Sequence, residues 1–216
     1  MEIPIQEEVR IPVDNTTLEG ELILPPKAKA IIIFSHGSGS SRFSRRNQQV
    51  AKYLQGKDFG TLLFDLLTEV EDKNYYNRFN IELLSKRLVG ATEWIEKFVT
   101  KDYPLGFFGA STGAASALKA AAVLSQIRVV VSRGGRPDLA MSDLPNVEAP
   151  TLLIVGSLDY DVLQLNIAAY KQLKCEKKLE VVEGATHLFE EPGKMGIVSQ
   201  LAGNWFEKYL APVSIK

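Results

Sequence analysis

A chain of 216 residues with 45% apolar and 24% charged side chains has the composition of an ordinary globular protein. Its net charge of −1 creates no overall field that would attract nucleic acid or an anionic membrane, so neither is expected as a partner. No apolar run approaches the roughly 18 residues that a membrane span needs. Because α/β folds often reach about 250 residues in one unit, we expect a single domain over residues 1–216.

The single cysteine, Cys175, excludes an internal disulfide and fits a reducing compartment. Residues 1–13 carry three glutamates and lack the basic start and apolar run of a secretory signal. These two features predict a cytoplasmic location.

The chain begins with the pattern of an antiparallel hairpin. Apolar and polar residues alternate over 9–13, Asp14 and Asn15 supply a turn, and residues 18–24 return. Short, unbroken apolar runs follow, which are typical of strands covered on both faces of a parallel sheet. These strands are expected at residues 30–34, 61–64, 105–108, 129–131, 152–155 and 179–182.

Helical periodicity fills the segments between the apolar runs. Apolar residues three or four positions apart define one face of each of three helices: Ile81, Leu84, Leu88, Ala91, Ile95 and Phe98; Leu163, Ile167, Tyr170 and Leu173; and Val198, Leu201, Trp205 and Tyr209. The alanine-rich segment 114–124 would pack closely on a sheet. Strands that alternate with helices predict an α/β fold with a doubly wound, mostly parallel sheet of about eight strands. Ligands of such sheets bind at the carboxyl ends of the strands, so chemistry is expected in the loops there.

The loop after residues 105–108 contains the pattern G-x-S-x-G over residues 109–113. A sharp turn can hold a serine against a base, but it brings the flanking positions so close that only small side chains fit. The same turn directs the N–H of Thr112, at a helix start, toward a developing oxyanion. The pattern predicts Ser111 as a nucleophile. The alternative is a glycine-rich helix start without catalysis.

A second loop of small residues, 35–40, follows the first apolar run. Its backbone can supply another N–H to the oxyanion, with Ser38 as the expected donor and Gly39 as the alternative. Gly37 and Gly39 are expected to border the substrate. His36 is expected to brace this loop by hydrogen bonding and not to act as the base. The alternative is a flexible glycine turn.

An acid and a histidine complete the predicted site. Asp159 follows the run 152–155 and can orient a histidine, with Asp161 as the runner-up, and either acid could instead cap a helix. His187 lies in the loop after the last strand and can accept the serine proton, the alternative being a structural histidine. The chain order of Ser111, Asp159 and His187 is that of α/β-hydrolase triads.

The residues around these loops resemble the dienelactone-hydrolase-like branch of the α/β-hydrolases over nearly the whole chain. The similarity is most specific in residues 36–47, 62–69, 108–115, 130–140, 149–159 and 184–193, which resemble a subgroup found alone or fused to phosphoribosyltransferase domains. It implies the α/β-hydrolase fold, an esterase-type site, and no metal or other cofactor. Dienelactone hydrolases proper use a cysteine nucleophile, whereas this chain has Ser111, and Cys175 lies outside the turn. Ester hydrolysis is therefore expected to carry over, but not the dienelactone substrate.

Two groups of arginines should border the site: Arg133 and Arg136 after the run 129–131, and Arg42, Arg45 and Arg46 after the loop at 35–40. Guanidinium groups match carboxylate and phosphate, so one hypothesis is that Arg133 binds an anionic substrate. In the alternative, Arg133 holds a neighbouring acid such as Asp65 or Asp138.

The acidic and aromatic segment 69–79 is expected to form a short flap over the site, without a separate lid domain. The sequence thus predicts a serine hydrolase that cleaves small carboxylic esters through an acyl-enzyme. Acyl transfer on the same triad and a non-catalytic binding module are the alternatives.

Overall fold

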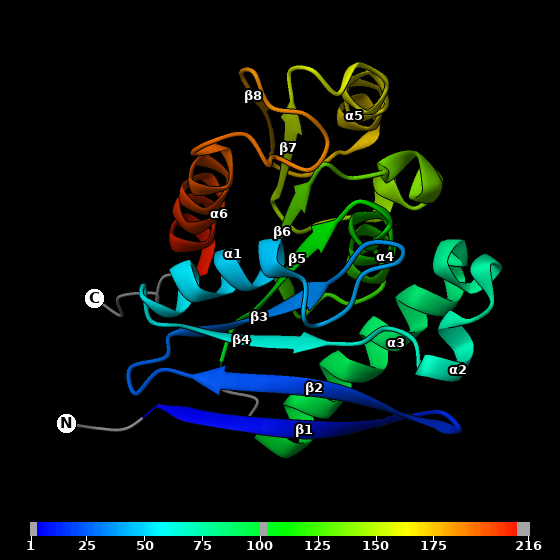
Figure 1. The fold of residues 1–216 in the computed structure, drawn as a ribbon, viewed down its shortest axis with the longest axis vertical. Coiled ribbons are helices and arrows are strands. Elements are labelled where there is room, and N and C mark those ends of the chain that lie inside the picture. Colours follow the sequence, from blue (N-terminus) through cyan, green and yellow to red (C-terminus); the bar gives the residue numbers. More distant parts are fainter. Residues whose placement is uncertain (1–3, 100–102, 211–216) are drawn as a thin grey trace.

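The computed structural model describes residues 4–99 and 103–210. In this part of the chain, eight strands form one mixed sheet in the order β1-β2-β4-β3-β5-β6-β7-β8, with helices on both faces (Figure 1). The sheet order and the antiparallel strands at one edge confirm the predicted α/β-hydrolase fold.

The first two strands form the predicted hairpin. β1 (Ile5–Val13) pairs antiparallel with β2 (Thr16–Leu24), and Asp14 in the turn between them adopts a positive φ of 52°. In the second half of β1, buried and exposed residues alternate, with Val9, Ile11 and Val13 facing the core. β2 then pairs antiparallel with β4, which joins the hairpin to the parallel part of the sheet.

Six parallel strands contain the predicted apolar runs. They are β3 (Ala30–Ser35), β4 (Phe59–Phe64), β5 (Leu105–Ala110), β6 (Ile127–Arg133), β7 (Thr151–Gly156) and β8 (Lys177–Val182). β3, β4, β5 and β7 are buried along their whole length, as expected for strands covered on both faces. Since all six run in one direction, their carboxyl ends meet at one edge of the sheet.

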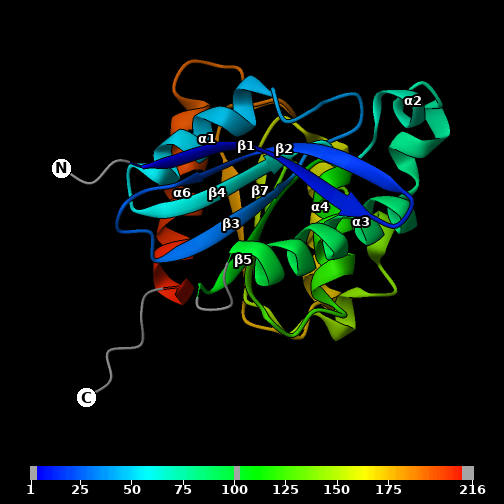
Figure 2. The same cartoon turned by 90° about the horizontal axis from the view of Figure 1, so that it is seen from below.

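The long helices divide into two layers (Figures 1 and 2). One apolar core lies between the sheet and α1 (Arg45–Gln55) with α6 (Lys194–Leu210). The other lies between the sheet and α3 (Ile81–Trp94), α4 (Thr112–Ala121) and α5 (Tyr160–Gln172). The alanine-rich α4 is buried almost throughout, which matches its predicted close packing.

Two predicted helix faces need correction. Phe98 is 61% exposed, whereas Ile95 is buried, because the chain changes to a π-helix over Ile95–Val99. The wider π turn rotates Phe98 away from the face that Ile81 begins. In α5, the predicted face is right only in part: Leu173, just after the helix, is buried and the half-buried Tyr170 packs against the core. The buried positions within the helix are Asn166 and Ala169, while Leu163 and Ile167 are half-buried.

Short helices follow two of the strands. α2 (Glu69–Asp72) and the 3-10 helix Tyr75–Phe79 lie between β4 and α3, and the 3-10 helices Pro137–Ala140 and Leu144–Asn146 follow β6. Among the described residues, no helix combines the length and apolar character that crossing a bilayer requires.

Candidate active site

Ser111 occupies the turn between β5 and α4 in a backbone conformation that a serine rarely adopts. Its φ of 52° and ψ of −122° place it outside the common allowed regions. A Cβ on Gly113 would overlap the Ser35 carbonyl oxygen, and one on Gly109 would lie 2.5 Å from the Ala114 Cα. The turn therefore requires glycine on both sides of Ser111, for the reason that the G-x-S-x-G pattern suggested.

The loop after β3 packs directly against this turn. A Cβ on Gly37 would lie 3.1 Å from the Ser111 Cβ. His36 is buried, and its Nε2 accepts the Leu66 N–H at 3.0 Å while Nδ1 lies 3.0 Å from the Gly37 carbonyl oxygen. His36 thus links the loops after β3 and β4, which confirms its predicted bracing role. Burial lowers the pKa of His36.

The N–H of Ser38 already has a partner. It donates a 2.8 Å hydrogen bond to the Thr112 Oγ1, so this hydroxyl would have to move before Ser38 could donate to an oxyanion. Thr112 is the first residue of α4, where backbone N–H groups lack acceptors within the helix. Gly39 is exposed and has a positive φ of 67°.

His187 and Asp159 meet as the sequence pattern predicts. The His187 Nδ1 lies 2.6 Å from Asp159 Oδ2, and this leaves Nε2 for another partner. Asp161, the runner-up, is exposed in the first turn of α5.

The loops that carry Asp159 and His187 are joined by their own contacts. Leu158 donates its N–H to the Ala185 carbonyl oxygen at 3.0 Å, and Gly184 donates its N–H to Ser157 Oγ at 2.8 Å. A Cβ on Gly156 would overlap the Ala185 carbonyl oxygen. The end of β7 and the histidine loop therefore fix the acid–histidine geometry together.

Ser111 and His187 line one small cavity, which we call the triad pocket. It has a volume of about 210 Å³, and its lining includes Arg46, Asn47 and Arg133. No hydrogen bond joins Ser111 to His187 in the described residues. Such bonds often tighten only when substrate is bound.

Arg133 is the most unusual group in the triad pocket. It is 5% exposed, its Nη2 donates a 3.4 Å hydrogen bond to Asn47 Oδ1, and its buried Nε has no partner among the described residues. Burial and the nearby positive charge of Arg46 lower the pKa of the Arg133 guanidinium to about 10.

The acids proposed as partners of Arg133 bind other arginines. Asp65 pairs with Arg42, and Asp138 pairs with Arg136 at 2.8 Å. The alternative in which Arg133 holds one of these acids is therefore wrong. Within the described part of the chain, Arg133 faces the pocket without a carboxylate partner.

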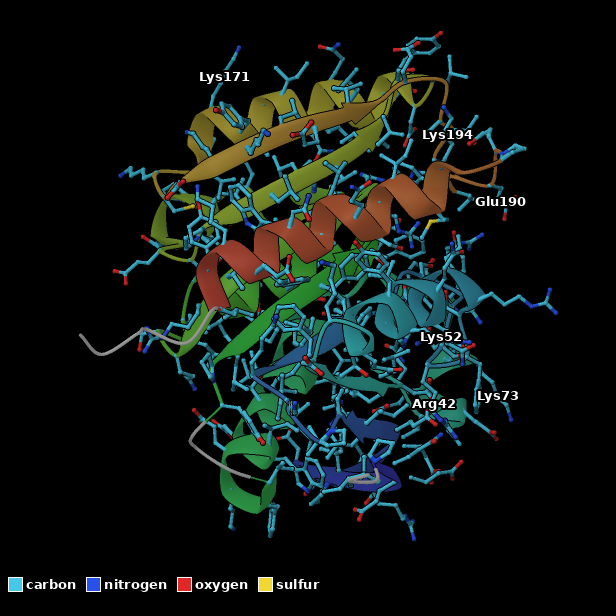
Figure 3. All side chains as sticks on the ribbon, turned by 90° about the vertical axis from the view of Figure 1, so that its left-hand side faces the viewer. Arg42, Lys52, Lys73, Lys171, Glu190 and Lys194 are labelled. Carbon is cyan, nitrogen blue, oxygen red and sulfur yellow. The ribbon has the colours of Figure 1, made fainter. Side chains whose placement is uncertain are left out.

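Several supporting residues were not predicted. Asn47 is buried beside Arg133, and Asn166 donates a 3.0 Å hydrogen bond to the Gly135 carbonyl oxygen in the loop after β6. Glu190 lies in the loop that leads into α6 (Figure 3). Its carboxylate pairs with Arg46 at 2.6 Å. Hydrophobic periodicity gives no signal for buried amides, and the Arg46–Glu190 pair joins residues far apart in the sequence.

The segment 69–79, predicted as a flap over the site, lies beside it. α2 lines a second cavity of about 680 Å³ and does not line the triad pocket. We call this second cavity the outer groove. Of the three arginines after the loop at 35–40, Arg46 lines the triad pocket, Arg42 lines the outer groove, and Arg45 lines neither.

Among residues 4–99 and 103–210, no group of three or more histidine, cysteine, aspartate or glutamate side chains is placed to hold a metal ion. The chemistry that the described site offers comes from the Ser111 hydroxyl, the His187–Asp159 pair, backbone N–H groups and two guanidinium groups.

No protein-family model matches the chain. Two curated proteins from Mycobacterium tuberculosis strains CDC 1551 / Oshkosh and ATCC 25618 / H37Rv, each named "putative phosphoribosyl transferase", are 52% identical to it over 206 residues. The match covers 94% of this chain and 46% of each relative, so the chain spans about half the length of these curated relatives.

Solved structures match the chain over nearly its whole length. Est1E from Butyrivibrio proteoclasticus has a TM-score of 0.81 at 16% identity, covering 93% of this chain and 98% of its own, which shows a shared fold. A dienelactone hydrolase from Anabaena variabilis has a TM-score of 0.93 at 48% identity, covering 95% of this chain and 98% of its own. With such identity across almost the full length of both chains, this chain belongs to the dienelactone hydrolase family of α/β-hydrolases.

Proposed function

We propose that this protein is a serine esterase that cleaves small carboxylic esters through an acyl-enzyme. The observation that carries the proposal is the 2.6 Å contact between Asp159 Oδ2 and the Nδ1 of His187, which lines the triad pocket together with Ser111. An Nδ1–H that donates to Asp159 leaves Nε2 as an acceptor, which is the tautomer that a general base needs.

In this mechanism, the Ser111 oxygen attacks the acyl carbonyl carbon while His187 Nε2 takes the serine proton. The N–H groups of Thr112 and Ser38 stabilise the oxyanion, and the Thr112 hydroxyl must first turn away from Ser38. His187 returns the proton to the leaving alcohol. Water then attacks the acyl-enzyme with the same base, which restores Ser111.

We further propose that the substrate carries an anionic group that binds Arg133. A buried guanidinium without a carboxylate partner loses hydration and gains little in return, so an anion in the pocket would stabilise it. Arg46 lies close enough to affect the pKa of Arg133 and lines the same pocket. Arg46 is paired with Glu190, so the uncompensated charge of Arg133 is the one that favours a carboxylate or phosphate near the reacting ester.

The test is a panel of p-nitrophenyl esters of varied charge, run on the wild type and on Ser111→Ala, with fluorophosphonate labelling of both. The proposal expects Ser111-dependent turnover and labelling of the wild type alone. Equal rates for the two proteins would rule out the triad. Faster turnover with an added alcohol or thiol than with water would favour acyl transfer, and an unlabelled wild type would favour a non-catalytic binding module.

A further inference from the structure

The outer groove and the triad pocket are neighbours at the same edge of the sheet. Both are lined by Ser40, in the loop after β3. We propose that the outer groove binds an uncharged apolar chain of the ester whose reacting group sits at Ser111. This inference rests on the proposed esterase function and adds a substrate class to it.

The size of the triad pocket is the first argument. Pockets that enclose drug-sized ligands have volumes of about 300–1,000 Å³. The triad pocket, at about 210 Å³, holds the reacting ester and a short anionic group. A longer substituent must leave it, and the outer groove, at about 680 Å³, begins at the shared residue Ser40.

Apolar side chains of the outer groove supply the second argument. Leu18 and Leu67 form buried parts of its lining, while Phe43 is 62% exposed and Val70 is 76% exposed. Phe43 and Val70 come from different segments of the chain yet line one cavity, where a bound apolar chain would cover them. Covering such surface is favourable in proportion to the area removed from water.

Charge distinguishes the two cavities. The lining of the outer groove includes four carboxylates, Glu19, Asp65, Glu69 and Asp72, and the single cation Arg42. Arg42 pairs with both Asp65 and Glu19, Asp72 pairs with Arg78, and Glu69 has no ion pair among the described residues, so the lining remains negative. The triad pocket has no carboxylate in its lining, and of its two arginines Arg46 pairs with Glu190 while Arg133 has no carboxylate partner among the described residues. An anionic group is therefore favoured near Ser111 and disfavoured in the outer groove, which leaves the groove to an uncharged chain.

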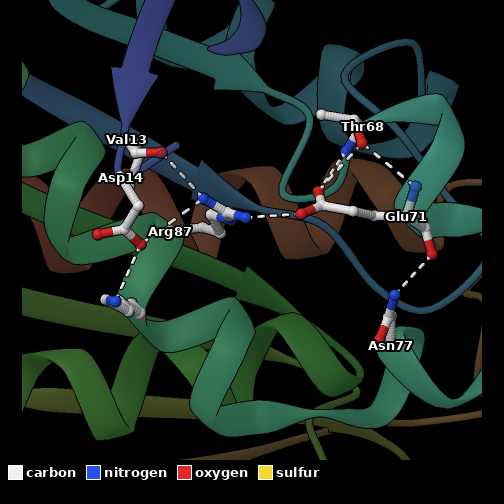
Figure 4. A network of polar contacts seen from close by, with 7 residues as sticks. Val13, Asp14, Thr68, Glu71, Asn77 and Arg87 are labelled. Atoms are coloured by element: carbon white, nitrogen blue, oxygen red, sulfur yellow. Dashed lines mark hydrogen bonds and ion pairs between the residues drawn. The ribbon is translucent and has the colours of Figure 1, made fainter. Parts of the chain in front are cut away.

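The α2 wall of the outer groove is held in place before any ligand binds. Thr68 caps α2 by accepting the Glu71 N–H, and Glu71 accepts the Thr68 N–H in return at 2.9 Å. The same Glu71 carboxylate accepts a 2.6 Å hydrogen bond from the buried Arg87 of α3, whose other nitrogen donates to the Val13 carbonyl oxygen (Figure 4). A preformed wall lowers the entropic cost of binding.

The test measures kcat/KM in two ester series, because the apolar chain could be on either side of the ester bond. One series runs from p-nitrophenyl acetate to p-nitrophenyl octanoate, and the other from ethyl acetate to octyl acetate. The proposal expects one series to rise by up to about fourfold for each methylene, which corresponds to about 0.8 kcal/mol. A terminal carboxylate on the longest chain should abolish that gain.

Matched variants locate the effect. Phe43→Ser and Val70→Ser should flatten the rise and leave p-nitrophenyl acetate turnover unchanged. Phe98→Ser and Val123→Ser, at positions that are 61% and 71% exposed and lie outside both cavities, should leave the rise intact.

The outcomes separate the two proposals. If both series are flat, or if the rise survives Phe43→Ser and Val70→Ser, the groove assignment is wrong while Ser111-dependent acetate turnover still supports the esterase. If acetate turnover survives Ser111→Ala, the esterase proposal fails and the groove assignment fails with it.

Discussion

Arg133 and Asn47 meet through one hydrogen bond of 3.4 Å between Nη2 and Oδ1, and no carboxylate of the described residues pairs with this guanidinium. A buried charge with so little compensation is unfavourable for folding. We therefore expect Arg133→Met to leave the free energy of unfolding unchanged or raise it by about 1–2 kcal/mol. KM for an anionic ester should rise at least about tenfold, because a charge-assisted hydrogen bond is lost. Denaturant unfolding and ester kinetics measure the two effects.

The control for Arg133→Met is Arg136→Met. Arg136 is paired with Asp138 and does not line the triad pocket, so this variant should leave the ratio of KM values for anionic and neutral esters unchanged. An Arg133→Met protein that unfolds more easily and shows the same KM ratio as the wild type would point to a structural role for Arg133.

Gly113 offers a test of the turn that carries Ser111. A Cβ at this position would overlap the Ser35 carbonyl oxygen, which is backbone and cannot turn aside. Gly113→Ala should lower the free energy of unfolding by about 3 kcal/mol, at the upper end of overpacking costs, and abolish esterase turnover.

The matched variant is Gly196→Ala in α6, where nothing lies within 4 Å of the added Cβ. Because alanine has the better helix propensity, this variant should stabilise the protein by about 0.5–1 kcal/mol. Thermal unfolding measures the stability of both variants. A similar Tm for Gly113→Ala and Gly196→Ala would contradict the expected overlap at Gly113.

The parts of the fold that could be predicted are those that depend on residues close together in the sequence. The run 30–34 became β3, and the G-x-S-x-G pattern became the turn between β5 and α4, because buried strands and tight turns depend on local residue types. The loops then had to converge, since parallel strands place their carboxyl ends at one edge. Chain order and strand ends are therefore enough to pair Asp159 with His187.

The remaining features could not be predicted because they depend on contacts between residues far apart in the sequence or on local changes of helix type. Asp65 could have paired with Arg133 or Arg42, and only the packing of the segment 36–43 against the end of β4 assigns it to Arg42. The π turn that exposes Phe98 continues an apolar spacing that looks regular. Asn166 is a polar residue of α5, and the predicted face of this helix consisted of apolar residues. Apolar periodicity therefore could not predict that Asn166 is buried and bonded to Gly135.

Asp159 and Asp161 lie close in sequence, and the structure separates their expected roles. Asp159→Asn keeps the shape of the side chain but presents an amide to His187 Nδ1, which favours the wrong tautomer. We expect kcat to fall by about three to four orders of magnitude. Asp161→Asn changes an exposed residue in the first turn of α5 and should alter kcat by less than about twofold. Steady-state kinetics with a p-nitrophenyl ester compares them, and equal losses would show that Asp159 has no special place in the reaction.

His36 should make the stability of the protein fall in mild acid. Burial lowers its pKa below the ordinary value of 6.5, and the hydrogen bond with the Gly37 carbonyl and the charges of Asp65 and Asp72 oppose the shift more weakly. Below about pH 6.5, the unfolded chain takes up a proton that folded His36 resists, so the free energy of unfolding falls by up to about 1.4 kcal/mol per pH unit. Above that pH, both states are neutral at this residue and the effect disappears.

Comparison with His36→Gln isolates this contribution from the other titrating groups. The glutamine oxygen can still accept the Leu66 N–H but does not titrate, so the variant should lose less stability than the wild type between about pH 7.5 and about pH 5.5. Urea unfolding at the two pH values gives the difference. Parallel pH dependences would mean that His36 takes up its proton as readily in the folded protein as in the unfolded chain.

Glu71 connects stability to the outer groove. Its carboxylate accepts hydrogen bonds from both the Thr68 N–H and the buried Arg87, so Glu71→Ala removes a helix cap and leaves Arg87 with less compensation for its charge. The free energy of unfolding should fall by about 3 kcal/mol, whereas Glu71→Gln, which can retain the cap, should lose about half as much. Glu69→Ala, in the same short helix and without an ion pair among the described residues, should stay within about 0.5 kcal/mol of the wild type.

If the α2 wall helps to bind an apolar chain, Glu71→Ala should also flatten the chain-length series while Glu69→Ala leaves it steep. A destabilised Glu71→Ala protein with an unchanged series would show that the groove does not depend on this anchor.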